Sequence, residues 1–299
     1  MRDWREALTA AVPRVVLDEP LARYTTFKIG GPADAFLDAR ERDEVRVALR
    51  AARAVGVPVF VLGWGSNLLV KDRGVRGLVL RLTGEFEKVS FPGGDRARAG
   101  AAVRVPQLVV ACAEKGLSGL EPIVGVPGTV GGALAMNAGT RDGEIGPAVL
   151  EIEAADPADG SVRVLPREAL SFSYRHGPVG GLVALSCLLQ LKPGIKGDIM
   201  SAVARYQQKR LQTQPVHTFN VGSTFKNPPG RFAAQLIEQL GLKGHAIGGA
   251  RVSPVHANFI ENFAGAKASD VLALVDLIRE RARATFGVAL ELEMRVVGE

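Results

Sequence analysis

Two glycine-rich stretches contain the residues best suited to hold a ligand. One is Glu121–Gly139 (EPIVGVPGTVGGALAMNAG), and the other lies within Val57–Val70 (VPVFVLGWGSNLLV), directly after an apolar run. Glycine permits positive φ and close approach to the main chain, and successive free N–H groups form a concave anion site suited to a pyrophosphate. A plain Gly/Pro-rich connection remains the alternative for either stretch alone. Their presence in one chain suggests one extended ligand held from two sides.

A polar cluster follows at Gly222–Pro228 (GSTFKNP). Its hydroxyl, ammonium and carboxamide could hold and protonate an anionic substrate, although a serine cap with solvated neighbours explains the same residues. Near the C-terminus, Glu291 or Glu293 could act as a general acid or orient charge, and the pattern does not choose between them. Arg175, after Tyr174 in SFSYRHG, could bind a carboxylate or phosphate through its guanidinium, or be an ordinary surface arginine.

Composition limits the function classes. With 47% hydrophobic and 23% charged residues, the chain is typical of soluble globular proteins, and its formal charge of +6 is mild for 299 residues. No basic stripe indicates nucleic acid, so the excess charge favours an anionic small substrate or has no particular meaning. The 4 histidines are dispersed, which predicts no metal site, and the 2 cysteines lie in apolar surroundings typical of buried hydrophobes. The N-terminus lacks an apolar secretory core and no run reaches membrane-spanning length, so we expect a cytoplasmic protein without a membrane partner.

Helical and strand-like segments are clustered, which predicts an α+β fold rather than regular βαβ alternation. Gly63-x-Gly65 after a strand resembles the start of a Rossmann fingerprint, but strand, turn and strand follow instead of the required helix, so that reading fails. The predicted helices are 3–12, Asp43–Val55, Val105–Lys115, Asp198–Gln212, Phe232–Leu240 and Asp270–Phe286, the last with Ser269 as its cap. The predicted strands are Ala35–Leu37, Val57–Leu62, Gly77–Leu82, Lys88–Phe91, Ala97–Ala101, Val149–Ala154, Val162–Leu165, Leu182–Leu191, His256–Ile260 and an alternating strand over Val288–Val296.

Motifs in a fixed order along nearly the whole chain resemble the UDP-N-acetylenolpyruvoylglucosamine reductase family, in its shorter class without an extra tyrosine-bearing loop. They are TTFKIGGPAD, LGWGSNLLVKDRGVRGLVL, PGTVGGALAMNAG, SFSYR, GSTFKNP, VSPVHANFIEN and ELEMRVVG. The resemblance implies the FAD-binding fold of the vanillyl-alcohol-oxidase (PCMH) type, with two flavin lobes and a third α+β substrate lobe. We place the lobes at 1–75 (joined by the terminal strand 288–299), 76–194 and 195–287, with a boundary near Gly194–Gly197.

The resemblance also implies a reaction: NADPH reduces FAD, and flavin N5 then delivers hydride to the enolpyruvyl group of UDP-N-acetylglucosamine enolpyruvate, giving UDP-N-acetylmuramate for peptidoglycan. Carried onto matching positions, Ser223 donates the proton, Glu293 stabilises the intermediate and Arg175 polarises the substrate carboxylate. Hydride addition β to a carboxylate develops an enediolate, which preorganised charge stabilises and which is basic enough to take a serine proton. No obligate protein partner and no nucleic acid are expected.

The family's cofactor and substrate residues can be carried over in the same way. FAD would be held non-covalently, since neither glycine-rich stretch contains a histidine. The implied FAD-binding residues are Gly63, Gly65, Ser66, Asn67, Leu68, Gly125, Pro127, Gly128, Thr129, Gly131, Gly132, Asn137, Ala138 and Gly139. The implied substrate residues are Tyr174, Lys226, Asn227 and Asn258.

The chain departs from the family pattern at two places. His176-Gly177 stand where an acidic residue and a serine usually follow Tyr-Arg, and Thr140-Arg141-Asp142 replace a frequent Ala-Tyr-Gly. These departures concern local flavin and substrate contacts. Two other functions are compatible with parts of the pattern: another flavin oxidoreductase, such as a sugar or lactone oxidase, and a non-catalytic nucleotide-sugar or anion-binding protein.

Overall fold

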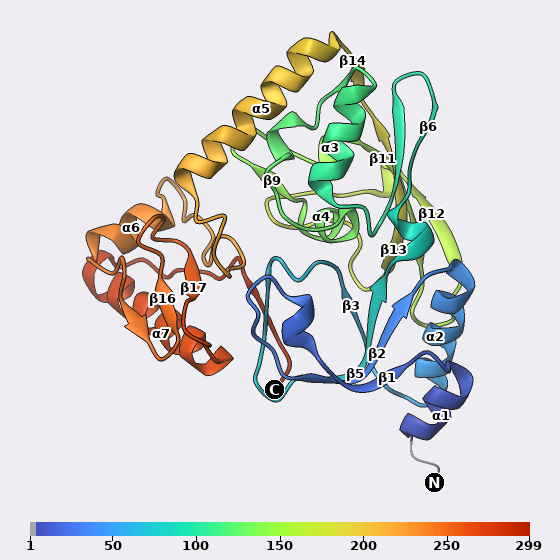
Figure 1. Cartoon of the computed structure of the whole chain (residues 1–299), viewed down its shortest axis with the longest axis horizontal. Coiled ribbons are helices and arrows are strands. Elements are labelled where there is room, and N and C mark those ends of the chain that lie inside the picture. The colour runs from blue at the N-terminus through green and yellow to red at the C-terminus, as the bar shows by residue number, and fades with distance from the viewer. Residues whose placement is uncertain (1–3) are drawn as a thin grey trace. The chain divides into compact units, whose positions relative to one another are not determined.

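A computed structural model describes residues 4–299 (Figure 1). Its contacts group the chain into two compact units: unit 1 comprises Met1–Leu17, Ala35–Trp64 and Gly77–Lys209, and unit 2 comprises Asp18–Asp34, Gly65–Arg76 and Arg210–Glu299. The second glycine-rich stretch thus divides between the units after Trp64. The division into three lobes at 1–75, 76–194 and 195–287 stays a prediction.

Two sheets lie mainly in unit 1. The first has strand order β1-β2-β5-β3 with β3 parallel to β5, and the second has order β12-β11-β13-β7-β6 with antiparallel neighbours throughout. The helices assigned here are α1 (Trp4–Ala11), α2 (Arg42–Ala54), α3 (Val105–Glu114), α4 (Val130–Met136) and α5 (Lys196–Thr213), whose last residues enter unit 2. The strands of the two sheets are β1 (Val16–Pro20), β2 (Pro32–Ala39), β3 (Val59–Leu62), β5 (Val75–Leu82), β6 (Val89–Gly93), β7 (Arg96–Gly100), β11 (Val149–Ala155), β12 (Val162–Pro166) and β13 (Val183–Gln190).

Two short strand pairs complete this unit. They are β8 (Leu117–Ser118) with β14 (Lys192–Pro193), and β9 (Gly139–Thr140) with β10 (Gly143–Glu144). The predicted hairpin around Asp159-Gly160 is confirmed, since β11 and β12 pair antiparallel and Gly160 adopts a φ of 71°.

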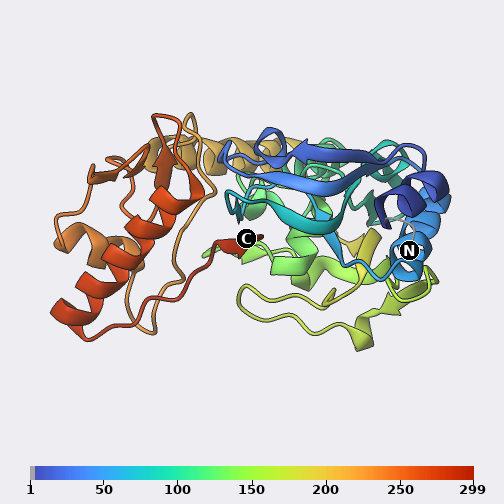
Figure 2. The same ribbon diagram turned by 90° about the horizontal axis from the view of Figure 1, so that it is seen from below.

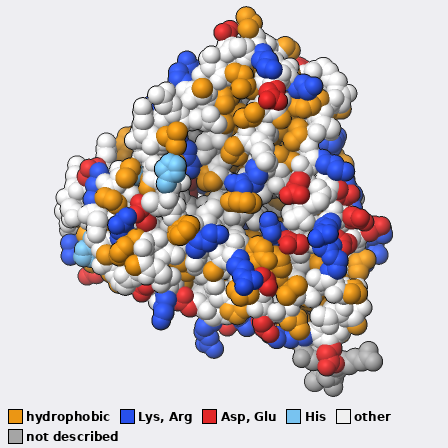
Figure 3. All heavy atoms as spheres, viewed as in Figure 1, with side chains coloured by type: hydrophobic (Ala, Val, Ile, Leu, Met, Phe, Trp, Pro, Cys, Tyr) orange, Lys and Arg blue, Asp and Glu red, His pale blue; other side chains and the backbone are white. Residues whose placement is uncertain are grey.

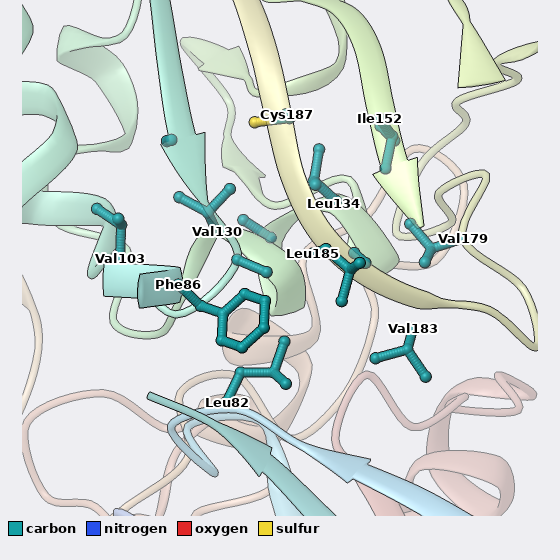
Figure 4. Packing of buried hydrophobic residues seen from close by; sticks show 14 of the residues in the cluster. Leu82, Phe86, Val103, Val130, Leu134, Ile152, Val179, Val183, Leu185 and Cys187 are labelled. Carbon is teal, nitrogen blue, oxygen red and sulfur yellow. The ribbon is translucent and has the colours of Figure 1, made fainter. Parts of the chain in front are cut away.

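The core of unit 1 explains why its helices form where they do. On α2 the buried residues Val45, Ala48, Leu49 and Ala52 recur at helical spacing, which places one face of the helix in the apolar cluster. Figure 4 shows the Phe86 ring beside Leu82, with Val130 and Leu134 of α4 and Leu185 of β13 in the same cluster. Strand β13 is buried along nearly its whole length. Because both of its faces are covered, its sequence is a mostly apolar run without alternation.

Unit 2 contains a three-stranded antiparallel sheet of order β15-β16-β17 and the parallel pair β18-β4. Its elements are β4 (Leu68–Val70), α6 (Ala233–Gln239), β15 (Ala246–Ile247), β16 (Ala250–Val252), β17 (Ile260–Asn262), α7 (Ala268–Phe286) and β18 (Arg295–Val297). Helix α7, the long red-orange helix of Figure 2, contacts β15 and β16 and buries Val271, Leu274, Val275 and Ile278 in a second apolar cluster.

Most predicted elements are confirmed, but several details were wrong. Strand β17 begins at Ile260, and the predicted strand His256–Ile260 is a turn in which the Phe259 N–H donates to the His256 carbonyl. The terminal strand is only Arg295–Val297, although Leu290 and Met294 are buried and Glu291 is exposed, as the alternation predicted. Helix α4 was not expected inside the glycine-rich stretch. The helix predicted at 3–12 is α1, and residue 3 lies outside the described residues.

The cap of α7 was also wrongly predicted. Lys267, not Ser269, is the N-cap residue, and the Asp72 carboxylate accepts the N–H groups of Ala268 and Ser269 at 2.8 and 3.1 Å. The capping acceptor therefore comes from a loop almost two hundred residues earlier, which explains why a local sequence pattern could not identify it.

Charge and cysteine placement agree with the composition. Basic and acidic side chains are interspersed on the face shown in Figure 3. Cys112 and Cys187 are free and buried, and burial raises the pKa of both thiols to about 12, so they act as small hydrophobes. Among residues 4–299, no His, Cys, Asp and Glu side chains cluster as metal ligands would, and none of the helices there has the length and apolarity needed to span a bilayer.

Candidate active site

Arg175 sits at the tip of a tight turn in unit 1. Ser173 and His176 exchange both backbone hydrogen bonds, at 2.9 and 3.0 Å, and Arg175 between them has a φ of 56°. A non-glycine residue in the left-handed region costs on the order of 1–2 kcal/mol, and such residues concentrate at functional sites. Tyr174 is 53% exposed, and the Arg175 guanidinium lies 4.8 Å from its ring centroid.

This turn is fixed to the glycine-rich stretch Glu121–Gly139. Asn137, fully buried and itself left-handed at a φ of 43°, donates from Nδ2 to the Ser173 carbonyl at 3.1 Å and accepts the Gly146 N–H at Oδ1. The Gly177 N–H donates to the Ala135 carbonyl at 3.1 Å, and a Cβ at Gly177 would overlap the carbonyl oxygen of Leu134. The departure Gly177 is thus required by close packing against the end of α4.

The glycine-rich stretch offers free donors, but not at every predicted position. The N–H groups of Val130 and Gly131 donate to the carbonyls of Val103 and Ala101, both at 2.8 Å, so the first amides of α4 are satisfied within unit 1. Gly131 therefore has a packing role, since its Cβ would lie 3.1 Å from that of Ala101. By contrast, among residues 4–299 no hydrogen-bond acceptor is paired with the N–H groups of Gly125, Gly128 and Thr129.

Thr129 also links this stretch to the start of the other one. A Cβ on Gly63 would lie 2.7 Å from the Thr129 hydroxyl oxygen, so only glycine lets the two segments approach this closely. Free amides beside a side-chain hydroxyl and a glycine without a Cβ are what a diphosphate requires. This part of the predicted set is brought together in unit 1, and it fits an FAD diphosphate.

Ser223 and Glu293 lie on adjoining segments of unit 2. The Glu293 N–H donates to the carbonyl of Thr224, the residue after Ser223, at 2.9 Å, and Phe225 and Leu292 form a bridge in the same antiparallel arrangement. Ser223 and Glu293 are both half-buried. Glu291, in contrast, is exposed and pairs with Lys226 at 3.3 Å. A partly buried carboxyl beside the serine segment favours Glu293 as the chemical group.

Three predicted contact residues instead hold this segment in place. Asn258, 4% exposed, accepts the Phe225 N–H at 3.0 Å and donates to the Phe225 carbonyl at 2.8 Å. The Asn227 side chain accepts the Ala233 N–H at the start of α6. Asn67 donates to the Glu293 carbonyl at 3.1 Å. The sequence motifs predicted that these asparagines contact ligands. They could not show that the side-chain amides form hydrogen bonds with backbone groups of the same chain.

Lys209 and Arg210, two cations that the sequence offers without a supporting motif as ligands of the substrate diphosphate, lie near the end of α5. Lys209 forms an ion pair with Asp142 at 3.2 Å. Asp142 is one of the three residues, Thr140-Arg141-Asp142, at which the chain departs from the family pattern. Burial lowers the pKa of the Arg210 guanidinium. The two groups of predicted residues otherwise separate by unit: Arg175, Gly63 and the stretch Glu121–Gly139 belong to unit 1, whereas Gly65–Leu68, Ser223, Glu293, Lys226, Asn227 and Asn258 belong to unit 2.

A family model described as "FAD binding domain" matches residues 33–165, and with the mixed sheets and glycine-rich loops it defines the chain as an FAD-containing oxidoreductase with a PCMH-type fold. A second model, "UDP-N-acetylenolpyruvoylglucosamine reductase, C-terminal domain", matches residues 214–297. The chain belongs to the UDP-N-acetylenolpyruvoylglucosamine reductase family.

Relatives along the whole length support this assignment. The UDP-N-acetylenolpyruvoylglucosamine reductase of Anaeromyxobacter dehalogenans is 45% identical over 299 residues, covering 99% of this chain and 90% of the relative. The UDP-N-acetylenolpyruvoylglucosamine reductase of Moorella thermoacetica is 42% identical over 297 residues, covering 98% of this chain and 97% of the relative.

Solved structures agree. The crystal structure of the reductase from Thermus caldophilus superposes with a TM-score of 0.81 at 40% identity, covering 95% of this chain and 98% of that one. Phl p 4.0202, a glucose dehydrogenase, has a TM-score of 0.51 at 13% identity over 65% of this chain, which shows a shared fold only.

Proposed function

We propose that this chain reduces UDP-N-acetylglucosamine enolpyruvate to UDP-N-acetylmuramate, with NADPH as reductant and non-covalently bound FAD, as a cytoplasmic step of peptidoglycan precursor synthesis. The family membership supports the reaction. FAD, when bound, accepts hydride from NADPH and passes it to the substrate. The chain's own residues supply binding, charge stabilisation and the proton.

The observation that carries the proposal is the backbone hydrogen bond between Glu293 and Thr224, which fixes the carboxylic residue beside the segment of Ser223. In the proposed mechanism the Ser223 hydroxyl donates its proton to the substrate carbon next to the carboxylate. Glu293 stabilises the enediolate that precedes this transfer. Positioned proton donors contribute typically about 10²- to 10⁴-fold to a rate.

Arg175 is proposed to bind the substrate carboxylate, where negative charge develops. Its backbone is held in a strained turn closed by the two hydrogen bonds between Ser173 and His176. Tyr174, Lys226, Asn227 and Asn258 complete the proposed substrate set, and for the two asparagines the supporting contacts are those that hold the GSTFKNP segment.

The proposed FAD residues include the free amides of Gly125, Gly128 and Thr129, with Ser66 at the second stretch. The proposed FAD set also includes Gly63, Gly65, Leu68, Pro127, Gly132, Ala138 and Gly139. Three further residues of the set would shape the FAD site without touching the cofactor. Gly131 packs against Ala101, and the side chains of Asn137 and Asn67 form hydrogen bonds within the chain.

Anaerobic titration tests the function. Purified protein should be yellow, release FAD on denaturation, bleach on addition of NADPH and recover its colour on addition of the enolpyruvyl substrate. Reduction by a sugar with reoxidation by oxygen would instead identify another flavin oxidase. A colourless protein that FAD cannot reconstitute would exclude both.

Substitution of Ser223 tests the assignment of the proton donor. Ser223→Ala should lower kcat by about 10³-fold or more, with FAD still bound and still reduced by NADPH. Ser90→Ala, an exposed serine on β6, is the matched control and should leave kcat unchanged. Turnover of Ser223→Ala near the control value would show that another group supplies the proton.

A further inference from the structure

Arg104 and Trp64 form a stacked pair that the family's site residues do not account for. Arg104 is the N-cap residue of α3, and Trp64 lies between Gly63 and Gly65 in the glycine-rich stretch after β3. The guanidinium carbon of Arg104 lies 3.3 Å from the centroid of the Trp64 ring, and Trp64 is 39% exposed. A planar guanidinium against an aromatic face is a stable arrangement that fixes an otherwise flexible side chain.

The part of the chain that the structure describes holds no counter-charge for Arg104. Among residues 4–299, no carboxylate forms an ion pair with it, and its buried Nε has no hydrogen-bond partner. Burial alone lowers the pKa of this guanidinium, since no acidic neighbour offsets the desolvation. A partly buried guanidinium without a counter-charge and a buried Nε–H without an acceptor both cost free energy. An anion bound beside Arg104 would offset this cost.

The position of Arg104 indicates which anion. Arg104 forms a β-bridge with Thr129, because the Val105 N–H donates to the Gly128 carbonyl at 3.0 Å and the Val130 N–H donates to the Val103 carbonyl at 2.8 Å. The Thr129 hydroxyl in turn lies against Gly63, the residue before Trp64. The stacked pair therefore joins both glycine-rich stretches next to the free amides of Gly128 and Thr129.

We propose that Arg104 is a further cofactor-binding residue of this chain, whose guanidinium binds the diphosphate of FAD, and that Trp64 is the positioning residue that holds it. This inference rests on the proposed function. FAD, NADPH and the UDP-linked substrate all contain a diphosphate, so the shared chemistry is that of a dinucleotide or nucleotide diphosphate. We assign it to FAD because the pair adjoins the amides of the proposed flavin loops.

Flavin binding to the apoprotein provides the test. The Kd values for FAD and for riboflavin, which lacks phosphate, are measured by quenching of flavin fluorescence. Arg104→Gln should weaken FAD binding by about 10- to 100-fold, the range for loss of a charged hydrogen bond, and leave riboflavin binding unchanged. Arg104→Lys should restore part of the affinity because it keeps the charge.

Two more variants separate positioning from folding. Trp64→Ala should weaken FAD binding by about 3- to 10-fold, and Trp64→Phe, which keeps an aromatic face, by less. Arg163→Gln, which removes a guanidinium 53% exposed on β12, is the matched control and should bind FAD as the wild type does. Melting of each apoprotein checks that the variants are folded.

The outcomes are decisive. Equal FAD affinity in Arg104→Gln and wild type would overturn this inference and leave the proposed function standing. So would a raised KM for NADPH or for the enolpyruvyl substrate with an unchanged Kd for FAD, since the diphosphate would then belong to another ligand. An equal loss of riboflavin binding would also overturn it, because the effect would not depend on phosphate. A wild-type protein without affinity for FAD would overturn both proposals.

Discussion

The Asn67 side chain donates a hydrogen bond from Nδ2 to the backbone carbonyl of Glu293 at 3.1 Å. The Asn67 carbonyl accepts the Arg295 N–H at 3.0 Å, and the Glu293 N–H donates to Thr224 at 2.9 Å. The backbone of Glu293 is therefore held on one side by the glycine-rich stretch and on the other by the segment of Ser223. These bonds limit where the carboxyl group of Glu293 can reach.

Asn67→Ala should therefore affect turnover more than cofactor affinity. Loss of the amide leaves the Glu293 carbonyl without its donor, at a cost of about 1–3 kcal/mol, and loosens the position of the carboxyl group. We expect kcat to fall by about 10- to 100-fold and the Kd for FAD to change by less than about 5-fold. Stopped-flow reoxidation of the flavin by substrate measures the loss of turnover, and flavin fluorescence measures the Kd for FAD. A larger loss of FAD affinity than of kcat would make Asn67 chiefly a flavin ligand.

Glu293→Gln and Glu291→Gln form a matched pair on the same segment. Because Glu293 is half-buried beside the Ser223 segment and Glu291 is exposed with Lys226 as its partner, only the first change should impair the reaction. We expect Glu293→Gln to lower kcat by about 10²-fold or more, and Glu291→Gln to stay within about 3-fold of wild type. Steady-state kinetics with saturating NADPH gives both values; the reverse order would reassign the carboxyl group.

Asp72→Ala should destabilise unit 2. Asp72 accepts two N–H groups at the start of α7, and loss of a helix cap costs about 0.5–2 kcal/mol. Ser269→Ala is the control, since Ser269 is exposed and is not the N-cap residue, and it should stay within about 0.5 kcal/mol of wild type. Urea unfolding of the two variants measures the difference. Destabilisation by Ser269→Ala as large as that by Asp72→Ala would contradict the assignment of Asp72 as the main capping acceptor.

Periodicity and turn chemistry predicted much of the fold because those signals are local. Helix α2 shows an apolar face at helical spacing, and the hairpin of β11 and β12 turns at Asp159-Gly160. In the terminal segment, Leu290 and Met294 are buried as the alternation predicted, but only Arg295–Val297 form a strand. A strand needs a neighbouring strand to pair with, and the local sequence does not show whether the fold supplies one.

What could not be predicted depends on partners far apart in the sequence. The amides of Asn67, Asn137 and Asn258 were expected to meet ligands, yet each bonds to backbone groups of its own unit. The stack of Arg104 on Trp64 joins residues forty positions apart. The choice of Glu293 over Glu291 came from resemblance to a family, and the packing around Thr224 now supports it independently.

The His256 imidazole should make stability depend on pH. Burial lowers the pKa of His256 below its ordinary value of 6.5; Lys243 lowers it further, while Glu238 and a backbone hydrogen bond raise it. The unfolded chain therefore binds the proton more readily, so stability is full above pH 6.5 and falls as the pH is lowered through the folded pKa. Protonation also removes the Nδ1 lone pair that accepts the Asn258 N–H at 3.3 Å.

Thermal melting between pH 8 and pH 5 checks this expectation. His256→Asn keeps an acceptor but cannot titrate, so its melting temperature should fall less than that of wild type over this range. The Phe259 ring, whose centroid lies 4.7 Å from that of the His256 ring, would be retained as a packing neighbour in the variant. Parallel pH profiles for the two proteins would show that the imidazole does not contribute.

Gly177→Ala should disturb the turn that carries Arg175. A Cβ at Gly177 would overlap the Leu134 carbonyl at the end of α4, so either the helix end or the turn must move. Overpacking of this kind costs typically about 1–3 kcal/mol, and a shift of about 1 Å at a binding group can cost about 10²-fold in rate. We expect both a lower free energy of unfolding and a higher KM for the enolpyruvyl substrate. Gly180→Ala, in the same loop, is the control because a Cβ there meets no atom within 4 Å. If Gly177→Ala and Gly180→Ala behaved alike, the contact between the turn and α4 would not position Arg175.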